Sequence, residues 1–232
     1  MPDLPGLFAD WSTATLTDAC VRLNLAVRTA PPGLRAVTGG AMAGPVRPAR
    51  HYGSVDVFLE ALEGASPGDV LVIDNDGRLD EGCIGDLTII ETRLAGLAGV
   101  VCWGAHRDTR ELLQLGFPVF TYGSMPNGPL ALRPRPEDAL RAARVGPVTA
   151  TAGDVVFADA DGAVFVAARD CGRVLGEART IRAAEREQAN RAAAGRSLRE
   201  QFRFGEFLAR RAREPQYTLR QHLRAAGLSI EE

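Results

Sequence analysis

Strand-like and helix-like segments alternate between residues 69 and 123, and this alternation constrains the fold more than any other feature. Short apolar runs at 69–74, 100–103 and 117–123 alternate with segments of helically spaced apolar residues at 86–97 and 109–115. Strands that alternate with helices in this way form parallel sheets joined by right-handed crossovers. The sequence therefore predicts an α/β fold.

Local signals at the ends of these segments sharpen the prediction. The stretch Asn75-Asp76-Gly77 has the composition of a tight turn, so we expect it to close the strand over 69–74. Gly116 follows the helix over 109–115 in the position of a C-terminal cap.

The remaining segments extend the same domain on both sides. We expect helices over 13–24 and 54–63 and a small-residue strand over 41–49. Asp161-Gly162 interrupts the apolar segment 154–168 and predicts a β-hairpin. From about 170 to 226 the sequence is rich in arginine, alanine and glutamate, which indicates helix with solvated charged faces.

We divide the chain into an α/β domain over 1–195 and a C-terminal helical extension over 196–232. The extension gathers apolar side chains among arginines and glutamates, namely Leu198, Phe202, Phe204, Phe207 and Leu208. Such a cluster fits a helix that lies on a neighbouring subunit with its charged side in water. The alternative is that the extension folds back on its own subunit.

The composition excludes several classes of partner. A formal net charge of −2 gives no strong field to attract nucleic acid or a membrane surface. No apolar run reaches the length of a membrane span, so we expect a cytoplasmic protein. The cysteines are scattered with no C-x-x-C pair, which signals neither a zinc clip nor a disulfide framework.

The chain contains no lysine, because all 27 basic residues are arginine. Schiff-base chemistry, pyridoxal anchoring and a Walker lysine therefore have no side chain to use. If the protein acts on a carbonyl compound, a group other than an amine must hold the electrons.

Acidic and basic residues mark the two ends of the helix-and-strand unit over 85–108. Asp86 begins the helix, and Arg107-Asp108 follow the next strand. Asp108 with Glu111 fits a helix N-terminal cap, and Asp86 has the same simple explanation. Helix capping does not explain Arg107. This residue lies beyond the carboxyl end of a strand, where α/β proteins bind ligands, and its guanidinium suits a carboxylate or phosphate.

Other candidate residues give weaker signals. His106 is the histidine to watch because it precedes Arg107, although a packing role is the simpler interpretation. Residues 74–77 (DNDG) with Asp80 have a faint likeness to a calcium loop, but no flanking helices complete it, and we interpret them as a turn. No phosphate-binding loop or nucleophile elbow is present.

The spacing of Asp86, twenty residues and then Arg107-Asp108 resembles the D-x20-R-D signature of the RraA-like family. Similar segments follow in the family's order: PGDVLVIDNDG, GDLTIIETRLAGLAGVV, GAHRDTRELLQLGFPVFTYG and AGDVVFADADGAVFV. The resemblance covers roughly residues 12–200, and TLRQHLRAAGLSI resembles the C-terminal segment of the aldolase branch. This branch contains the metal-dependent 4-hydroxy-4-methyl-2-oxoglutarate/4-carboxy-4-hydroxy-2-oxoadipate aldolases.

The resemblance implies an RraA-like swivelling β/β/α domain that assembles into homotrimers or homohexamers, with active sites at subunit interfaces. By position, Asp108 would bind Mg²⁺ or Mn²⁺ directly, and Asp86 would act on the metal through water. Arg107 would hold the pyruvyl group of the substrate. The turn Gly85-Asp86-Leu87-Thr88 would offer backbone N–H groups to the same substrate.

The sequence departs from the family pattern near its C-terminus. Aldolase members supply a further carboxylate from a neighbouring subunit, for which Glu185 or Glu187, acting through water, are the candidates here. Many members have Gly-Glu-Ser where this chain has Gly195-Arg196-Ser197, and His106 stands where small apolar residues are usual.

The resemblance, together with the absence of lysine, implies a class II, metal-dependent lyase that cleaves a 4-hydroxy-2-oxo acid to pyruvate, with oxaloacetate decarboxylation as a second activity. One alternative is a non-catalytic regulator that binds a ribonuclease, as the family's namesake does. Another is a lyase of a specialised pathway that acts on a different oxo acid. The complete D-x20-R-D pattern favours an enzyme, because namesake-type regulators do not need a carboxylate at position 86.

Overall fold

The computed structural model describes residues 11–227 and contains a seven-stranded sheet with the order β1-β5-β4-β3-β2-β8-β9. The strands are β1 (Arg35–Thr38), β2 (Met42–Arg50), β3 (Val70–Ile84), β4 (Gly99–His106), β5 (Val119–Thr121), β8 (Asp154–Asp159) and β9 (Gly162–Ala167). The four central strands β2 to β5 run parallel, and β1, β8 and β9 are antiparallel to their neighbours. The α/β prediction is confirmed.

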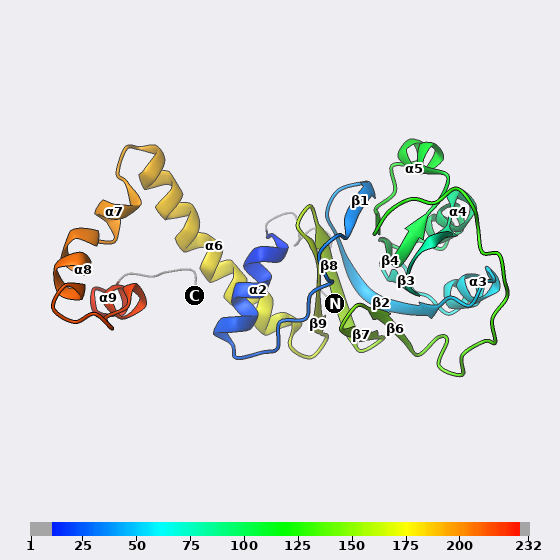
Figure 1. Ribbon diagram of the computed structural model, residues 1–232, viewed down its shortest axis with the longest axis horizontal. Coiled ribbons are helices and arrows are strands. Elements are labelled where there is room, and N and C mark those ends of the chain that lie inside the picture. Colours follow the sequence, from blue (N-terminus) through cyan, green and yellow to red (C-terminus); the bar gives the residue numbers. More distant parts are fainter. Residues whose placement is uncertain (1–10, 228–232) are drawn as a thin grey trace.

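Five helices surround this sheet (Figure 1): α2 (Thr13–Arg22), α3 (Asp56–Glu63), α4 (Asp86–Leu94), α5 (Thr109–Leu115) and α6 (Cys171–Ala193). Helices α3, α4 and α5 lie at one end of the molecule, beside the parallel strands. Helices α2 and α6 pack together against the β8–β9 hairpin at the other side. Buried aliphatic and aromatic side chains fill the space on both sides of the sheet.

Two predicted ends are confirmed, and one is wrong. Gly116 caps α5 with a left-handed φ of 63°. The predicted hairpin is present, with Ala160 and Asp161 in its turn and Gly162 as the first residue of β9. The expected turn over 75–77 does not end its strand, because β3 continues to Ile84. Asp76 and Gly77 take positive φ angles of 58° and 69° there, and the pairing of β3 with β4 shifts its register. The turn residues form a bulge inside a long strand.

The small strand pair β6 (Ala142–Val145) and β7 (Val148–Thr151) was not predicted. The two strands form an antiparallel hairpin around Gly146, whose φ of 61° suits a tight turn. Each strand is only four residues long, which is too short for a clear alternation of apolar and polar side chains.

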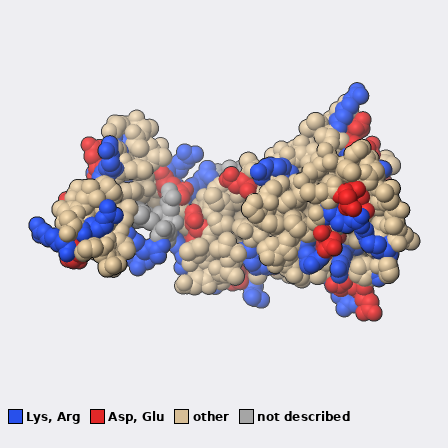
Figure 2. All heavy atoms as spheres, viewed as in Figure 1, with Lys and Arg blue, Asp and Glu red and all other residues tan. Residues whose placement is uncertain are grey.

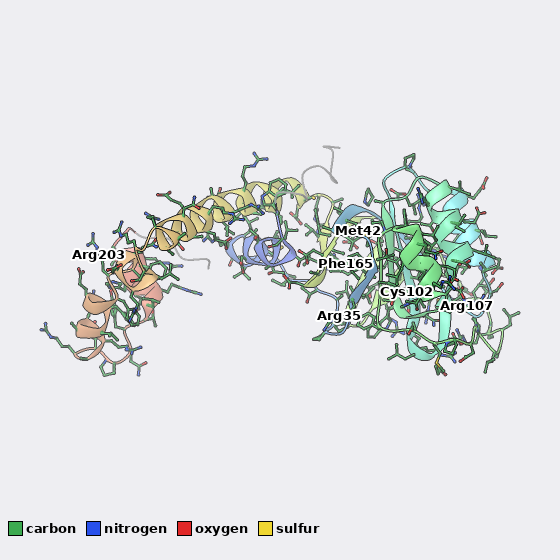
Figure 3. All side chains as sticks on the ribbon, turned by 90° about the horizontal axis from the view of Figure 1, so that it is seen from above. Arg35, Met42, Cys102, Arg107, Phe165 and Arg203 are labelled. Atoms are coloured by element: carbon green, nitrogen blue, oxygen red, sulfur yellow. The ribbon has the colours of Figure 1, made fainter. Side chains whose placement is uncertain are left out.

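Three short helices follow α6 and lie beyond its far end in two perpendicular views (Figures 1 and 3): α7 (Leu198–Gln201), α8 (Phe204–Arg211) and α9 (Leu219–Ala225). Phe207 is buried among Phe204, Tyr217 and His222, so these helices pack on one another. They do not fold back on the α/β body. Leu198 and Leu208 stay 48% and 43% exposed, and their burial against a neighbouring subunit remains a prediction.

Basic and acidic side chains are interspersed over both the α/β body and the C-terminal helices on the face shown in Figure 2. The cysteines Cys20, Cys83, Cys102 and Cys171 are buried thiols. Within residues 11–227, no helix is long and apolar enough to cross a membrane.

Candidate active site

The carboxyl ends of three parallel strands converge on one cavity of about 300 Å³. His51 follows β2, Gly85-Asp86 follow β3, and Arg107 follows β4. Since these strands are parallel neighbours, the residues after them reach the same edge of the sheet. Residues that line the cavity include His51, Cys83, Gly85, Leu87, Thr88 and Arg107. The sequence prediction that Asp86 and Arg107 meet at one site is consistent with this geometry.

Glycines make room for the Arg107 side chain. A Cβ atom added at Gly82, Gly85 or Gly128 would stand 3.0, 3.2 or 3.1 Å from atoms of that side chain. The backbone N–H of Arg107 donates to the carbonyl of Ile84 at 2.9 Å, which ties the residue to the end of β3. The guanidinium is therefore held along the cavity wall although its side chain is 49% exposed.

Asp108 occupies the N-terminal cap position of α5 but does not cap it. The residue has a left-handed φ of 58°, and its side chain accepts no hydrogen bond from the first turn of the helix. Its Oδ2 instead lies 3.4 Å from the backbone N of Asp86 and 3.4 Å from Nε of Arg107. The capping interpretation is wrong, because the carboxylate is turned toward the start of α4 and the guanidinium of Arg107.

Gly85 is required for this arrangement. A Cβ at position 85 would lie 2.2 Å from Oδ2 of Asp108, which no real side chain could tolerate. The φ of Gly85 is −145°, an extended conformation that any residue adopts. The close approach of Asp108 is therefore the reason for glycine here, and backbone freedom is not.

The first turn of α4 already donates to carboxylates. The N–H of Asp86 points to Asp108, and the N–H of Leu87 donates to Oδ1 of Asp86 at 2.7 Å. The family resemblance implies that these N–H groups serve a substrate. A bound anion would have to displace the side chains that now accept from them, or be drawn by the remaining positive potential of the helix end.

The carboxylates of Asp86 and Asp108 are the oxygen donors that a hard cation could use at this site. Among residues 11–227, no three histidine, cysteine, aspartate or glutamate side chains gather as a complete cage. Mg²⁺ commonly keeps several waters and binds through one or two carboxylates together with substrate oxygens. The donor set thus fits Mg²⁺ or Mn²⁺ and does not fit a thiolate or imidazole metal centre.

Glu185 and Glu187 lie on α6, which runs away from the cavity toward the C-terminal helices (Figure 1). Figure 3 shows Arg107 at the end of the body opposite to Arg203 in the C-terminal helices. Glu187 pairs with Arg191 at 3.5 Å. One chain does not bring either glutamate to Asp108, so their participation stays a prediction that requires a second subunit.

His51 lines the cavity and was not predicted. Its Nδ1 lies 2.8 Å from Oδ1 of Asn75, which Nη2 of Arg133 also approaches at 3.5 Å. Since that amide oxygen serves two donors, Nδ1 carries the proton and Nε2 keeps its lone pair. The ring stacks on Phe58 with centroids 5.2 Å apart. Burial lowers the pKa of His51, so the imidazole is neutral near pH 7.

The sequence did contain a signal for His51. It lies two residues after the predicted strand over 41–49, as Arg107 lies four residues after the predicted strand over 100–103, and the rule for carboxyl ends of parallel strands applies to both. His106 received more attention, but the structure gives it a packing role. Its ring nitrogens lie 2.7 Å from Oγ1 of Thr121 and 3.0 Å from Oγ1 of Thr109.

The sequence profile of the RraA-like family, described as Aldolase/RraA, matches residues 13–165. This chain belongs to the RraA-like family. A protein of Aromatoleum aromaticum, provisionally named 4-hydroxy-4-methyl-2-oxoglutarate aldolase, is 30% identical over 156 residues, which is 67% of this chain and 95% of the relative. The family expectation from the sequence is confirmed.

Solved structures agree with this assignment. Streptomyces coelicolor RraAS2, described as an unusual member of the RNase ES inhibitor RraA protein family, is 29% identical with a TM-score of 0.69. The match covers 82% of this chain and 96% of that one. An uncharacterized protein from Pseudomonas syringae pv. tomato has a TM-score of 0.73 at 21% identity, covering 86% and 96% of the two chains, and it supports the fold alone.

Proposed function

We propose that this chain is a divalent-metal-dependent lyase that cleaves a 4-hydroxy-2-oxo acid to pyruvate and a second carbonyl compound. The observation that carries the proposal is that Asp108 leaves its own helix uncapped and lies beside Arg107, whose side chain lines the cavity together with Asp86. The aldolase name of the Aromatoleum aromaticum relative supports the same reaction class. Oxaloacetate decarboxylation is proposed as a second activity, because it passes through the same pyruvate enolate.

In the proposed reaction the C3–C4 bond of the substrate breaks. The hydroxyl at C4 gives up its proton and becomes the carbonyl of the product. The electron pair of the broken bond passes to the C2–C3 enolate, which takes a proton at C3 and becomes pyruvate. A bound Mg²⁺ or Mn²⁺ would supply the Lewis acid that this charge requires, since no lysine is present to form an imine.

The chain's own residues would perform the remaining tasks. The guanidinium of Arg107 can bind the substrate carboxylate through two parallel hydrogen bonds. Asp108 and Asp86 would hold the cation. Nε2 of neutral His51 can accept a proton within the cavity, which suits the group that receives the C4 hydroxyl proton.

The test is pyruvate release from 4-hydroxy-4-methyl-2-oxoglutarate and from oxaloacetate, measured before and after EDTA treatment. We expect activity to disappear with EDTA and to return with added Mg²⁺ or Mn²⁺. Arg107→Lys should raise KM at least about tenfold, because an ammonium cannot reproduce two parallel hydrogen bonds. Full turnover in the chelated enzyme would refute the proposal.

A second function class is favoured by the resemblance to Streptomyces coelicolor RraAS2. A regulator of this kind would bind a ribonuclease and catalyse nothing. A pull-down that recovers a stable ribonuclease complex, from a protein that turns over neither oxo acid, would replace the lyase proposal with this one.

A further inference from the structure

A second, apolar cleft of about 280 Å³ is lined by residues of helices α3 and α4 and the residue before α3. The two helices lie at the same end of the molecule in Figure 1. The floor of the cleft is formed by Phe58 and Leu62, which are 1% and 9% exposed. Its walls include Leu59 and Ile90. The α3 side chains at the floor belong to the core, so the cleft is supported by packed structure.

The cleft adjoins the candidate active site, because the two spaces share lining residues. Val55, Leu87 and Thr88 line both the cleft and the cavity that contains Arg107. Val55 and Leu87 remain 52% and 72% exposed, although burying large apolar side chains lowers the free energy. The two spaces are therefore close enough for a substrate held at Arg107 to direct a substituent toward the cleft.

The charges around the two spaces are unequal. Arg107 is the one cation among the side chains of the described chain that line either space, whereas Asp86 and Glu91 both contribute carboxylates. One guanidinium can neutralise one substrate carboxylate. A second carboxylate placed toward α3 and α4 would meet apolar walls and the charge of Glu91, and its desolvation would be uncompensated.

We propose that this cleft binds an apolar substituent at C4 of the substrate, so that the enzyme prefers 4-hydroxy-2-oxo acids with a single carboxylate and an aliphatic or aryl group. The inference rests on the proposed lyase function. It distinguishes this chain from its aldolase-named relative, since an oxoglutarate carries two carboxylates. Cleavage would release pyruvate and an apolar aldehyde or ketone.

The experiment measures kcat/KM for pyruvate release from 4-hydroxy-2-oxo acids that carry methyl, propyl or pentyl groups at C4, alongside 4-hydroxy-4-methyl-2-oxoglutarate and oxaloacetate. Each added methylene should raise kcat/KM about fourfold, the factor that corresponds to burying one CH₂ group. The pentyl substrate should also exceed the dicarboxylate.

Two arginine variants locate the effect. Leu59→Arg places a charge in the cleft wall and should lower the ratio of pentyl to methyl kcat/KM by at least about tenfold, because the alkyl group of the substrate loses its apolar contact. Leu94→Arg alters an exposed leucine of α4 that lines neither space, and it should leave the ratio unchanged.

The outcomes separate the two proposals. Equal kcat/KM across the apolar series, a preference for the dicarboxylate, or an unchanged ratio in Leu59→Arg would overturn the cleft assignment while the lyase remained. If Leu59→Arg changed the oligomeric state in sedimentation and left the ratio of pentyl to methyl kcat/KM unchanged, the cleft would be a contact between subunits instead. Absence of pyruvate from every substrate, oxaloacetate included, would refute the lyase itself.

Discussion

Gly85 and Asp108 show how one missing side chain can fix the geometry of a site. The carboxylate of Asp108 lies in the space that a Cβ at position 85 would fill. A side chain at position 85 would push this carboxylate away, toward its own helix α5. The glycine therefore decides which of two roles the same aspartate takes.

We predict that Gly85→Ala folds normally and loses activity. The extended backbone accepts alanine, but Asp108 must move, and a displacement of about 1 Å at a catalytic group can cost about 100-fold in rate. The measurements are thermal unfolding and kcat for pyruvate release. Gly40→Ala is the matched control, because nothing lies within 4 Å of a Cβ there. Equal activity of the two variants would contradict this role.

His51 gives a prediction about acid stability. Burial lowers its pKa below the ordinary value of 6.5, so near pH 6 the unfolded chain binds a proton that the folded chain does not. Stability should fall as pH decreases through 6.5, by up to about 1.4 kcal/mol per pH unit, until the folded pKa is reached.

Urea unfolding at pH 7.5 and 5.5 tests this prediction. The wild type should lose more stability between these values than His51→Gln, which has no proton to bind in this range. If both proteins lost the same amount, another group would be responsible for the acid sensitivity.

Strand β3 is the element that carries the site, and its bulge is the feature that sequence reasoning misjudged. Turn residues at 75–77 usually end a strand, but here the neighbouring strand β4 continues and holds β3 in the sheet. Pairing with β4 therefore overrides the local turn propensity of residues 75–77. The second half of β3 then delivers Gly85 to the cavity, which a chain turn at 77 would not do.

We predict that Gly77→Ala destabilises the protein by about 1–3 kcal/mol. The φ of 69° is unfavourable for alanine, and the added Cβ would lie 2.7 Å from Cζ2 of Trp103. Gly172→Ala, in the first turn of α6 with nothing within 4 Å, should instead be neutral or slightly stabilising. Urea unfolding of both variants measures the contrast, and equal midpoints would show that the bulge is not constrained.

Much of the element order followed from the sequence because its signals are local. The helical spacing of apolar residues, the helix cap at Gly116 and the hairpin signal at Asp161-Gly162 each predict the structure of adjacent residues only. The convergence of Asp86 with Arg107 also followed, through the general rule for parallel strands. The same rule could have placed His51. The orientation of the Asp108 side chain depends on contacts between distant segments, which no periodicity encodes.

At the scale of the whole molecule, the C-terminal helices lie apart from the α/β body and have their own small apolar cluster around Phe207 (Figure 1). Exposed Leu198 and Leu208 then remain for contact with another subunit. Such an arrangement would let a neighbouring chain approach the cavity, where Glu185 or Glu187 could join the site.

We predict that truncation after Gly195 leaves the α/β body folded but abolishes oligomerisation and activity together. Because the removed helices pack on one another and not on the sheet, the thermal transition of the body should persist. Sedimentation and pyruvate release are the measurements, with Leu208→Arg as the point variant that should weaken the same contact. A truncated chain that stayed a trimer or hexamer and kept its activity would contradict the interface.

The direct binding of Mn²⁺ to the wild type and to Asp108→Asn tests the central claim, that Asp108 serves a cation and does not cap a helix. Asparagine keeps the shape and tolerates the left-handed backbone, so folding should be unchanged. We predict that the wild type binds one Mn²⁺ per chain and that Asp108→Asn binds it at least about 100-fold more weakly with the same melting temperature. Equal Mn²⁺ binding by the two proteins would contradict the account.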